Sequence, residues 1–333
     1  MAIRIALDLK LFDLVAPGPQ TLDDLVQATQ ADAKLLRRLL RMLTAIGWLK
    51  QESVDKWGAT PMSSAATIPA PRDWLIAHFD TRMETFTKFP EWLRKHNHKT
   101  SWLSDTNNIF MEQNNESAWE YMASHPEYGA RFDSAMSMQD SFPPEMSPRW
   151  PFDEEGQHIK NKGDGVTLVD IGGGFGQTIE SIKKAHPQLP GPFVLQDLPK
   201  SIDGLDPSRM SSIGFEAQAH DFFQPQPIKG AKYYLMRRVL HDWNDKKCLE
   251  ILVATRSAMD ASYSKLIIVD FVLPDLNAGL FETQTDLMMM TSCDGQERSE
   301  LEWHELLEKA GFKIDRITKA EIGATAVIEA SLA

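Results

Sequence analysis

The sequence predicts an α/β protein in which a doubly wound, Rossmann-like parallel sheet follows a mainly helical, winged-helix-like region. The sheet is indicated by apolar runs of strand length from residue 166 onward, which alternate with helical stretches such as DKKCLEILVATRSAMD and ELEWHELLEKAGF. The winged helix is indicated by two short helical stretches and a polar ribbon, WLKQESVDKWGATP, near the N-terminus. The apolar runs are VTLVDI, PFVLQD, AKYYLM, KLIIVDFVL and ATAVIEA.

The helices of the N-terminal region have recognisable ends. Thr21 and Asp24 form the pattern of a capping box before LDDLVQAT. Asp32 can cap the next helix, AKLLRRLLRMLTAI, and Gly47 can end it. A pattern of helix, helix and ribbon is typical of a winged helix that packs or dimerises.

Three regions follow from these patterns. The middle one is rich in Trp, Phe and Met at helical spacing, and a stretch full of Pro, Gly and charge at 143–165 marks its boundary with the sheet. We expect a winged-helix-like, dimerisation-type region over residues 1–62, a helical substrate-lid region over 63–150 and a Rossmann-like domain over 151–333.

Charge and composition exclude several classes of partner. The net charge is −12, and residues 1–60 hold eight Lys or Arg against seven Asp or Glu, so neither nucleic acid nor an anionic membrane is expected to bind. Two distant cysteines, Cys248 and Cys293, indicate reduced thiols. The apolar run of the first fifteen residues is interrupted by Asp8, Lys10 and Asp13, unlike a secretion signal or a spanning helix. We expect a soluble cytoplasmic protein.

The first predicted strand runs into a glycine loop at residues 172–176, GGGFG. A dinucleotide fingerprint would need glycine at position 177, which is Gln177. Pyrophosphate prefers a helix N-terminus with positive charge, whereas this loop is preceded by Asp170. The loop therefore favours a ligand without phosphates; its alternative interpretation is a tight structural turn.

Acidic residues at neighbouring strand ends identify such a ligand. Asp197 closes the second strand, where it can accept both hydroxyls of a ribose. Asp221 and Phe222 lie between the runs PFVLQD and AKYYLM, where they can bind an adenine amino group and cover its ring. A nucleoside that carries an ammonium and a carboxylate fits this set, and we expect S-adenosylmethionine. Each carboxylate alone is equally compatible with a helix cap.

His241, in YYLMRRVLHDWND, is the candidate catalytic residue. It follows a strand that ends at the same sheet edge as the glycine loop. Asp270 ends the run KLIIVD at this edge, and Glu297 precedes a helix. Either acid can hold one ring nitrogen while the other faces a substrate. The alternative is an imidazole with a structural role only.

The motifs LVDIGGGFG, LQDLP, HDFF, VLHDWND and GQERSELEWHELLEKAGF, in this order, resemble class I S-adenosylmethionine-dependent O-methyltransferases. The resemblance covers nearly the whole chain and is strongest to the plant caffeate and flavonoid group and its fungal secondary-metabolite relatives. LHDWND and GQERS are its specific parts. It implies a His general base and a homodimer.

The resemblance also implies site residues. His241 would be the base, with Asp270 and Glu297 beside it. The cofactor would be held by Gly172, Gly174, Gly176, Asp197, Asp221, Phe222, Arg237 and Trp243. The acceptor would face Phe132, Met136, Met288 and Met289.

The sequence departs from the family pattern at three places. Arg237 stands where the family usually has lysine, and Asp270 stands where it usually has glutamate. Family members also carry an extra helical segment before IRIALDLKLFD that interlocks the dimer, so dimerisation is less secure here than the family implies.

Methyl transfer from a sulfonium to oxygen needs alignment and removal of a proton, but no metal. A phenol titrates near pH 10 and an ordinary imidazole near 6.5, so full proton transfer to His241 would cost about 5 kcal/mol unless it is concerted with methyl transfer. Met and aromatic side chains fit a flat phenol or enol of a small aromatic secondary metabolite.

Two other functions are compatible with the sequence. A pericyclase or dehydratase of the same fold would use S-adenosylmethionine only as a bound positive charge, and the Arg237-Arg238 pair and the short Asp270 favour this alternative. A non-enzymatic winged-helix regulator or partner subunit is disfavoured, because the positions of the cofactor and the base are all retained.

Overall fold

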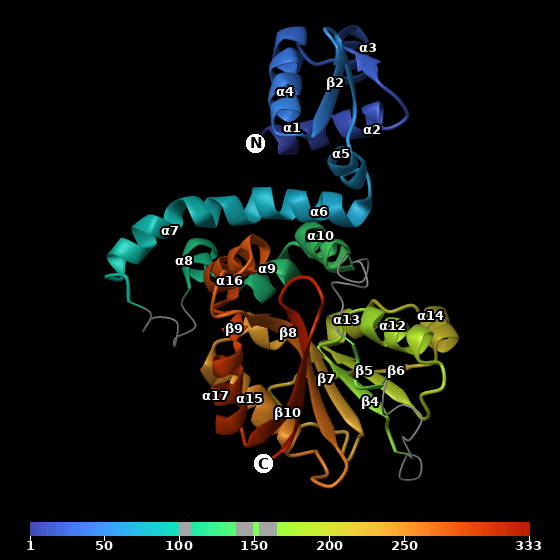
Figure 1. Ribbon diagram of the computed structural model, residues 1–333, viewed down its shortest axis with the longest axis vertical. Coiled ribbons are helices and arrows are strands. Elements are labelled where there is room, and N and C mark those ends of the chain that lie inside the picture. The colour runs from blue at the N-terminus through green and yellow to red at the C-terminus, as the bar shows by residue number, and fades with distance from the viewer. Residues whose placement is uncertain (100–107, 138–148, 153–164) are drawn as a thin grey trace. The chain divides into compact units, whose positions relative to one another are not determined.

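The computed structural model describes residues 1–99, 108–137, 149–152 and 165–333, and the chain divides into two compact units (Figure 1). Unit 1 comprises Met1–Pro90 and Trp119–Gln139, and unit 2 comprises Glu91–Ala118 and Asp140–Ala333. The expected middle region, 63–150, is thus shared between the two units. Most of the expected boundary at 143–165 lies outside the described residues.

Unit 1 begins with the winged-helix pattern. Its predicted caps are confirmed: Thr21 and Asp24 form a capping box, Asp32 accepts a hydrogen bond from the Leu35 amide, and Gly47 follows the last helix with a φ of +77°. The ribbon is a three-stranded antiparallel sheet in the order β1-β3-β2. The elements are α1 (Ala2–Asp8), α2 (Leu11–Val15), β1 (Gln20–Thr21), α3 (Leu22–Thr29), α4 (Ala33–Ala45), β2 (Leu49–Ser53) and β3 (Lys56–Ala59).

In the described residues, the helices α5 to α10 follow β3. A π-helical turn at His78–Arg82 joins α6 to α7, and α10 packs against α6 within unit 1. In unit 2, α8 packs against α16. The bounds are α5 (Pro61–Ala65), α6 (Pro69–Ala77), α7 (Met83–Lys95), α8 (Ile109–Asn114), α9 (Ala118–Ser124), α10 (Pro126–Met136) and α16 (Leu280–Cys293).

Unit 2 is built on an eight-stranded sheet in which seven strands follow the order β10-β11-β8-β7-β4-β5-β6, while β9 pairs with β8. The central strands are parallel, and the order reverses direction at β4, which lies between β5 and β7. Ligands of doubly wound sheets bind at such a reversal, at the carboxyl ends of the strands. The bounds are β4 (Leu168–Ile171), β5 (Phe193–Asp197), β6 (Glu216–Ala219), β7 (Tyr233–Arg237), β8 (Lys265–Leu273), β9 (Arg298–Ser299), β10 (Phe312–Lys319) and β11 (Thr325–Leu332).

Both faces of this sheet are buried, which explains the continuous apolar runs of its strands. One face packs Val169 and Ile268 against residues such as Leu252 and Leu306 of α15 and α17. The other packs Leu168, Leu235 and Ile267 against α12 and its neighbours. The helices are α12 (Gln177–Ala185), α13 (Pro199–Asp203), α14 (Pro207–Ile213), α15 (Asp245–Arg256) and α17 (Glu300–Lys309) (Figure 1).

Among the strands of unit 2, the apolar run of β11, ATAVIEA, was predicted, whereas β6, β9 and β10 were missed. β10 and β11 form an antiparallel hairpin against β8, so the sheet is mixed. The solvent-facing positions of β10 interrupt its apolar pattern, and β9 is only two residues long. No helix in the described ranges is long and apolar enough to cross a bilayer.

Ile267→Ala should lower the free energy of unfolding by about 2–5 kcal/mol, because Ile267 is fully buried in β8 and its truncation leaves a cavity. The exposed Ile322 is the matched control, and Ile322→Ala should change stability by no more than about 0.5 kcal/mol. Urea denaturation measures both values. Equal effects in the two variants would contradict the packing described for this face of the sheet.

Candidate active site

The predicted cofactor loop joins β4 to α12 and is shaped by two different constraints. A Cβ atom on Gly173 would lie 2.3 Å from the side chain of Leu195 and 2.6 Å from that of Asp170, so only glycine fits there. Gly174 has a φ of +58° and no atom within 4 Å of where its Cβ would lie. The backbone at Gly174 is therefore open to close approach by a ligand. The sequence analysis listed Gly172, Gly174 and Gly176 but missed the packing role of Gly173.

Asp197 connects this loop to the start of α13. Its Oδ2 accepts a hydrogen bond from the Gly174 amide at 2.9 Å, and its Oδ1 accepts one from the Leu198 amide at 2.7 Å. Each carboxylate oxygen has two lone pairs, so the half-buried carboxylate can still accept ribose hydroxyls. The two amide bonds fix its position beside the open glycine.

An aromatic group adjoins the loop. A Cβ on Gly172 would lie 3.5 Å from the Phe222 ring. Phe222 meets Phe223 edge-on at 5.0 Å between centroids, and Phe223 meets Trp243 at 4.9 Å. Asp221 accepts a hydrogen bond from the Phe223 amide at 3.0 Å, which fixes the turn that carries these rings. Phe222 and Trp243 were predicted; Phe223 was missed because nothing in the sequence shows which way it faces.

Arg237 ends β7 and Arg238 follows it, and the two side chains contact different elements. Arg237 donates a hydrogen bond to Thr178 Oγ1 on α12 at 3.1 Å. Arg238 has a φ of +55°, the left-handed region that is uncommon for residues other than glycine. This turn directs the Arg238 guanidinium over the Phe271 ring of β8, 3.5 Å from its centroid.

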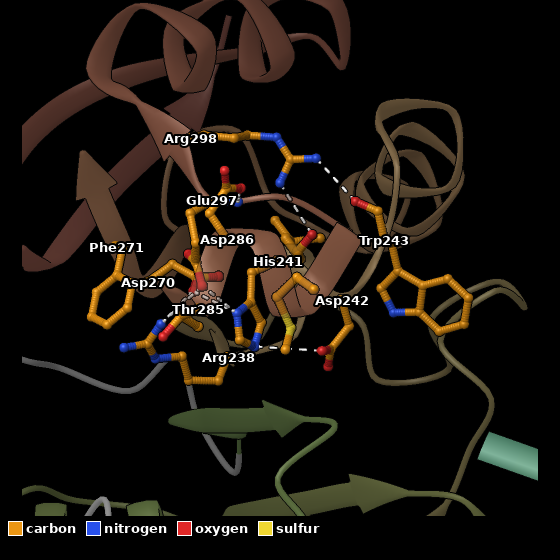
Figure 2. A network of polar contacts seen from close by, with 12 residues as sticks. Arg238, His241, Asp242, Trp243, Asp270, Phe271, Thr285, Asp286, Glu297 and Arg298 are labelled. Atoms are coloured by element: carbon orange, nitrogen blue, oxygen red, sulfur yellow. Dashed lines mark hydrogen bonds and ion pairs between the residues drawn. The ribbon is translucent and has the colours of Figure 1, made fainter. Parts of the chain in front are cut away.

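His241 lies in a 3₁₀ turn, Leu240–Asp242, that follows β7. Its Nδ1 donates a hydrogen bond to Glu297 Oε1 at 2.8 Å and lies 4.0 Å from Asp270 Oδ1 (Figure 2). Its Nε2 lies 3.6 Å from Asp242 Oδ1. The predicted proximity of both acids to the imidazole is confirmed. Asp270 does not end its strand as expected, since β8 continues to Leu273, but it lies one residue past the last pairing of β8 with β7.

The charges around His241 make it a stronger base than an ordinary imidazole. Burial acts to lower the pKa of His241, but the negative charges of Asp242, Glu297 and Asp270, with the hydrogen bond that Nδ1 donates to Glu297, outweigh burial and raise this pKa to about 9. The imidazole is therefore mostly protonated at pH 7. Asp242 was not among the charges expected near His241.

The two buried acids respond differently to the same surroundings. Burial raises the pKa of Asp270 to about 6, against the attraction of His241 and Arg238. Burial also acts to raise the pKa of Glu297, but the charge and hydrogen bond of His241 and the charge of Arg238 bring it below the ordinary value. Glu297, which bonds directly to the imidazole, is therefore the more firmly ionised partner.

His241, Asp270 and Glu297 also bring three potential metal-ligand atoms within 4.8 Å of one another. His241 Nδ1 and Glu297 Oε1 already bond to each other, and the Arg238 guanidinium lies 3.5 Å from Asp270 Oδ1. A second cation would be repelled by this guanidinium. Chemistry without a metal stays a prediction.

Arg298 fixes the backbone of the 3₁₀ turn that carries His241. Its side chain is fully buried and donates hydrogen bonds to the carbonyl oxygens of Leu240 at 3.1 Å and of Trp243 at 3.0 Å, the second of which is seen in Figure 2. It also pairs with Asp245 at 2.9 Å. The sequence analysis noted the GQERS motif but assigned no role to this arginine. A buried guanidinium bonded to two carbonyls fixes the turn on either side of His241.

The loop before β9 lies directly against the 3₁₀ turn of His241 at Gly295. A Cβ on Gly295 would lie 2.0 Å from the carbonyl oxygen of His241 and 2.8 Å from the carbonyl carbon of Asp242. The Gln296 amide donates to the His241 carbonyl at 3.0 Å. Only glycine permits this approach, and the approach brings Glu297 to the imidazole.

The predicted acceptor residues fall in both units. Met288 and Met289 are buried on α16 of unit 2, and Met289 Sδ lies 3.9 Å from Cys293 Sγ. Phe132 and Met136 lie on α10 of unit 1, where Phe132 meets Trp119 edge-on at 6.5 Å. Their role toward an acceptor stays a prediction.

Comparisons with known proteins agree with this architecture. Residues 97–313 match the O-methyltransferase domain family, and residues 1–67 match the O-methyltransferase dimerisation domain. The O-methyltransferase mfmE of Annulohypoxylon moriforme is 32% identical over 339 residues, which cover 99% of this chain and 82% of the relative.

Solved structures are similar over the whole chain. LepI in complex with SAM has a TM-score of 0.90 and 26% identity, and a protein described as a pericyclic reaction enzyme has 0.89 and 26%; 85% and 86% of those chains are covered. OxaC in complex with sinefungin and meleagrin has a TM-score of 0.87 and 27% identity, with 84% of its chain covered.

Gly295→Ala should displace Glu297 from the imidazole, because the added methyl group would overlap the His241 carbonyl. We expect loss of stability and of at least about 99% of turnover, since a misplacement of about 1 Å can cost roughly a hundredfold in rate. Gly18 is the control, since its Cβ position is open and Gly18→Ala should leave both properties unchanged. Thermal unfolding and turnover close to wild type in Gly295→Ala would disprove the close approach.

Proposed function

This chain belongs to the O-methyltransferase family, and we propose that it methylates a phenolic or enolic hydroxyl of a small aromatic secondary metabolite with His241 as the general base. The enzyme is an S-adenosylmethionine-dependent O-methyltransferase. The observation that carries the proposal is the buried imidazole of His241. Its Nδ1 donates a hydrogen bond to Glu297, so Nε2 is the nitrogen that could take a proton from an acceptor.

The residues at the sheet edge fit the cofactor. Gly174 offers open backbone, and Asp197 is fixed beside it by two amide bonds. The Phe222 ring lies next to the loop, where it can cover an adenine. When bound, S-adenosylmethionine supplies a methyl group that its positive sulfur activates. We propose that Gly172, Gly174, Gly176, Asp197, Asp221, Phe222, Arg237 and Trp243 hold it.

His241 would take the acceptor's proton at Nε2, since Nδ1 is engaged by Glu297. The pKa of His241 is about 9 and that of a phenol is near 10, so in the absence of an opposing charge, transfer of a proton to the neutral imidazole would cost about 1.4 kcal/mol instead of the 5 kcal/mol of an ordinary imidazole. Glu297, Asp270 and Asp242 then stabilise the imidazolium. The sequence-based estimate of this cost lacked the three charges.

The negative charges that raise the pKa of His241 must be offset by a positive charge before His241 can act as a base at pH 7. An imidazole with a pKa of about 9 is protonated at pH 7 and cannot accept a proton. A cation bound nearby lowers the pKa of a histidine, so occupation of the cofactor site by a sulfonium favours the neutral, basic form of His241. Binding of the cofactor would thus prepare the base that the acceptor needs.

We also propose an acceptor site formed with Met288 and Met289, whose apolar side chains suit a flat ring. Phe132 and Met136 are proposed acceptor residues from the family resemblance. The match of residues 1–67 to the dimerisation domain supports a homodimer.

A second candidate is a pericyclic or dehydration reaction without methyl transfer. The similarity to a pericyclic reaction enzyme favours it, as does the raised pKa of His241, whose partner Glu297 also lies 3.6 Å from the Arg238 cation. In that case no methyl group leaves the cofactor. Formation of S-adenosylhomocysteine therefore separates the two functions.

A screen of phenols with methyl-labelled S-adenosylmethionine should give a labelled ether and an equal amount of S-adenosylhomocysteine. His241→Gln should lower kcat/KM about 10²- to 10⁴-fold, the usual contribution of a general base, while cofactor affinity stays within about threefold. The exposed His304 on α17 provides the control, and His304→Gln should be fully active. Near-wild-type turnover by His241→Gln would refute the assigned base.

Asp197→Ala should weaken S-adenosylmethionine binding by roughly 10- to 150-fold, because hydrogen bonds to a charged group are worth about 1.5–3 kcal/mol. Asp203→Ala, at an exposed position on α13, is the control and should bind normally. Isothermal titration calorimetry measures both. Unchanged affinity in Asp197→Ala would show that the ribose contact lies elsewhere.

A further inference from the structure

Arg238 is close to the catalytic histidine but has no part in the family resemblance. We propose that Arg238 is a positioning residue that competes with His241 for the same two carboxylates and thereby sets how strongly the imidazole holds its proton. The proposal rests on the proposed role of His241 as base. It adds a residue whose charge adjusts that base.

The geometry of shared oxygens supports this role. Arg238 Nη1 lies 3.6 Å from Glu297 Oε1, the oxygen that accepts the hydrogen bond from His241 Nδ1 at 2.8 Å. The same Nη1 lies 3.5 Å from Asp270 Oδ1, and His241 Nδ1 lies 4.0 Å from that atom. Figure 2 shows the guanidinium and the imidazole approaching one pair of acids.

The position of Arg238 is fixed by its surroundings. Its left-handed backbone follows β7 directly, and its amide donates to the Val269 carbonyl at 3.0 Å. The guanidinium stacks on Phe271, and the side chain is only 15% exposed. Strained backbone of this kind persists where the surrounding structure determines it, and it is concentrated at functional sites. The charge is therefore held at one place rather than on a mobile surface arginine.

Electrostatics gives the direction of the effect. Both carboxylates are fully buried, so the charges near them interact strongly. Arg238 stabilises the ionised acids without accepting a proton, and it repels a proton on His241. Within the described part of the chain, the charged groups that face this cluster from the adjoining elements are Asp242, Asp270, Asp286, Glu297, Arg238 and Arg298. Two thiols lie nearby. Burial raises the pKa of Cys248 to about 12. The Sγ atom of Cys293 lies 3.8 Å from Asp242 Oδ1.

The test replaces the charge and follows the titration of His241 directly. Arg238→Gln and Arg238→Met remove the charge, the second with an apolar chain that can still pack on Phe271, while Arg238→Lys retains it. The His241 imidazole is titrated by NMR in histidine-labelled protein and assigned by its loss in His241→Gln. We expect its midpoint to rise by about one unit in both uncharged variants and to stay near wild type in Arg238→Lys.

Asp270→Asn should shift the midpoint the opposite way, because it removes a negative charge. If Arg238 had only a structural role, its uncharged variants and Asp270→Asn would not shift the His241 midpoint in opposite directions. Arg316, which pairs with Glu329 at 3.8 Å on the outer hairpin, is the matched control; Arg316→Gln should leave the titration unchanged. In turnover assays the rise of kcat/KM with pH should shift upward by the same amount in Arg238→Gln, a roughly tenfold loss at pH values below the midpoint.

An unchanged or lowered midpoint in both uncharged variants would overturn the proposal. An equal rise in Arg238→Lys would overturn it as well, since the charge would then not be the cause. The NMR titration needs no turnover, so it separates this proposal from the function. If His241 were not the base, its midpoint would still shift while the kinetic profile would not follow.

Discussion

The hydrogen bond from His241 Nδ1 to Glu297 Oε1 is the interaction on which the site depends. It joins residues 56 positions apart in the chain, one after β7 and one before β9. Gly295 permits the two backbones to approach, and Arg298 fixes the turn that carries the imidazole. With Nδ1 engaged by Glu297, the proposed proton transfer would involve Nε2, so this one bond would select both the tautomer and the nitrogen that reacts.

This bond also places the catalytic residue among opposed charges. Buried carboxylates are unfavourable unless they are paired and hydrogen-bonded. Asp270 and Glu297 are compensated by His241 and Arg238, and a sulfonium adds a further positive charge when the cofactor site is occupied. Without a further cation the pKa of His241 is about 9, and a cationic cofactor bound nearby would lower it. In the proposed reaction such a balance would tie proton removal to the presence of the methyl donor.

Sequence reasoning found the fold and the residues that come together at the sheet edge, because strand ends can be predicted from apolar runs. It placed His241 beside Asp270 and Glu297, and the glycine loop beside Asp197. It missed Gly295 and Arg298, whose roles depend on contacts between segments far apart in the chain. It noted the Arg237-Arg238 pair but predicted no contact of Arg238 with the acids beside His241, because a left-handed backbone at a residue other than glycine leaves no trace in the sequence.

A crystal structure with S-adenosylhomocysteine and the best phenol from a screen tests the central claim most directly. We predict that the acceptor oxygen lies within about 2.6–3.2 Å of His241 Nε2 while Nδ1 remains on Glu297. An acceptor oxygen beyond reach of Nε2, or an imidazole turned away from Glu297, would contradict the account.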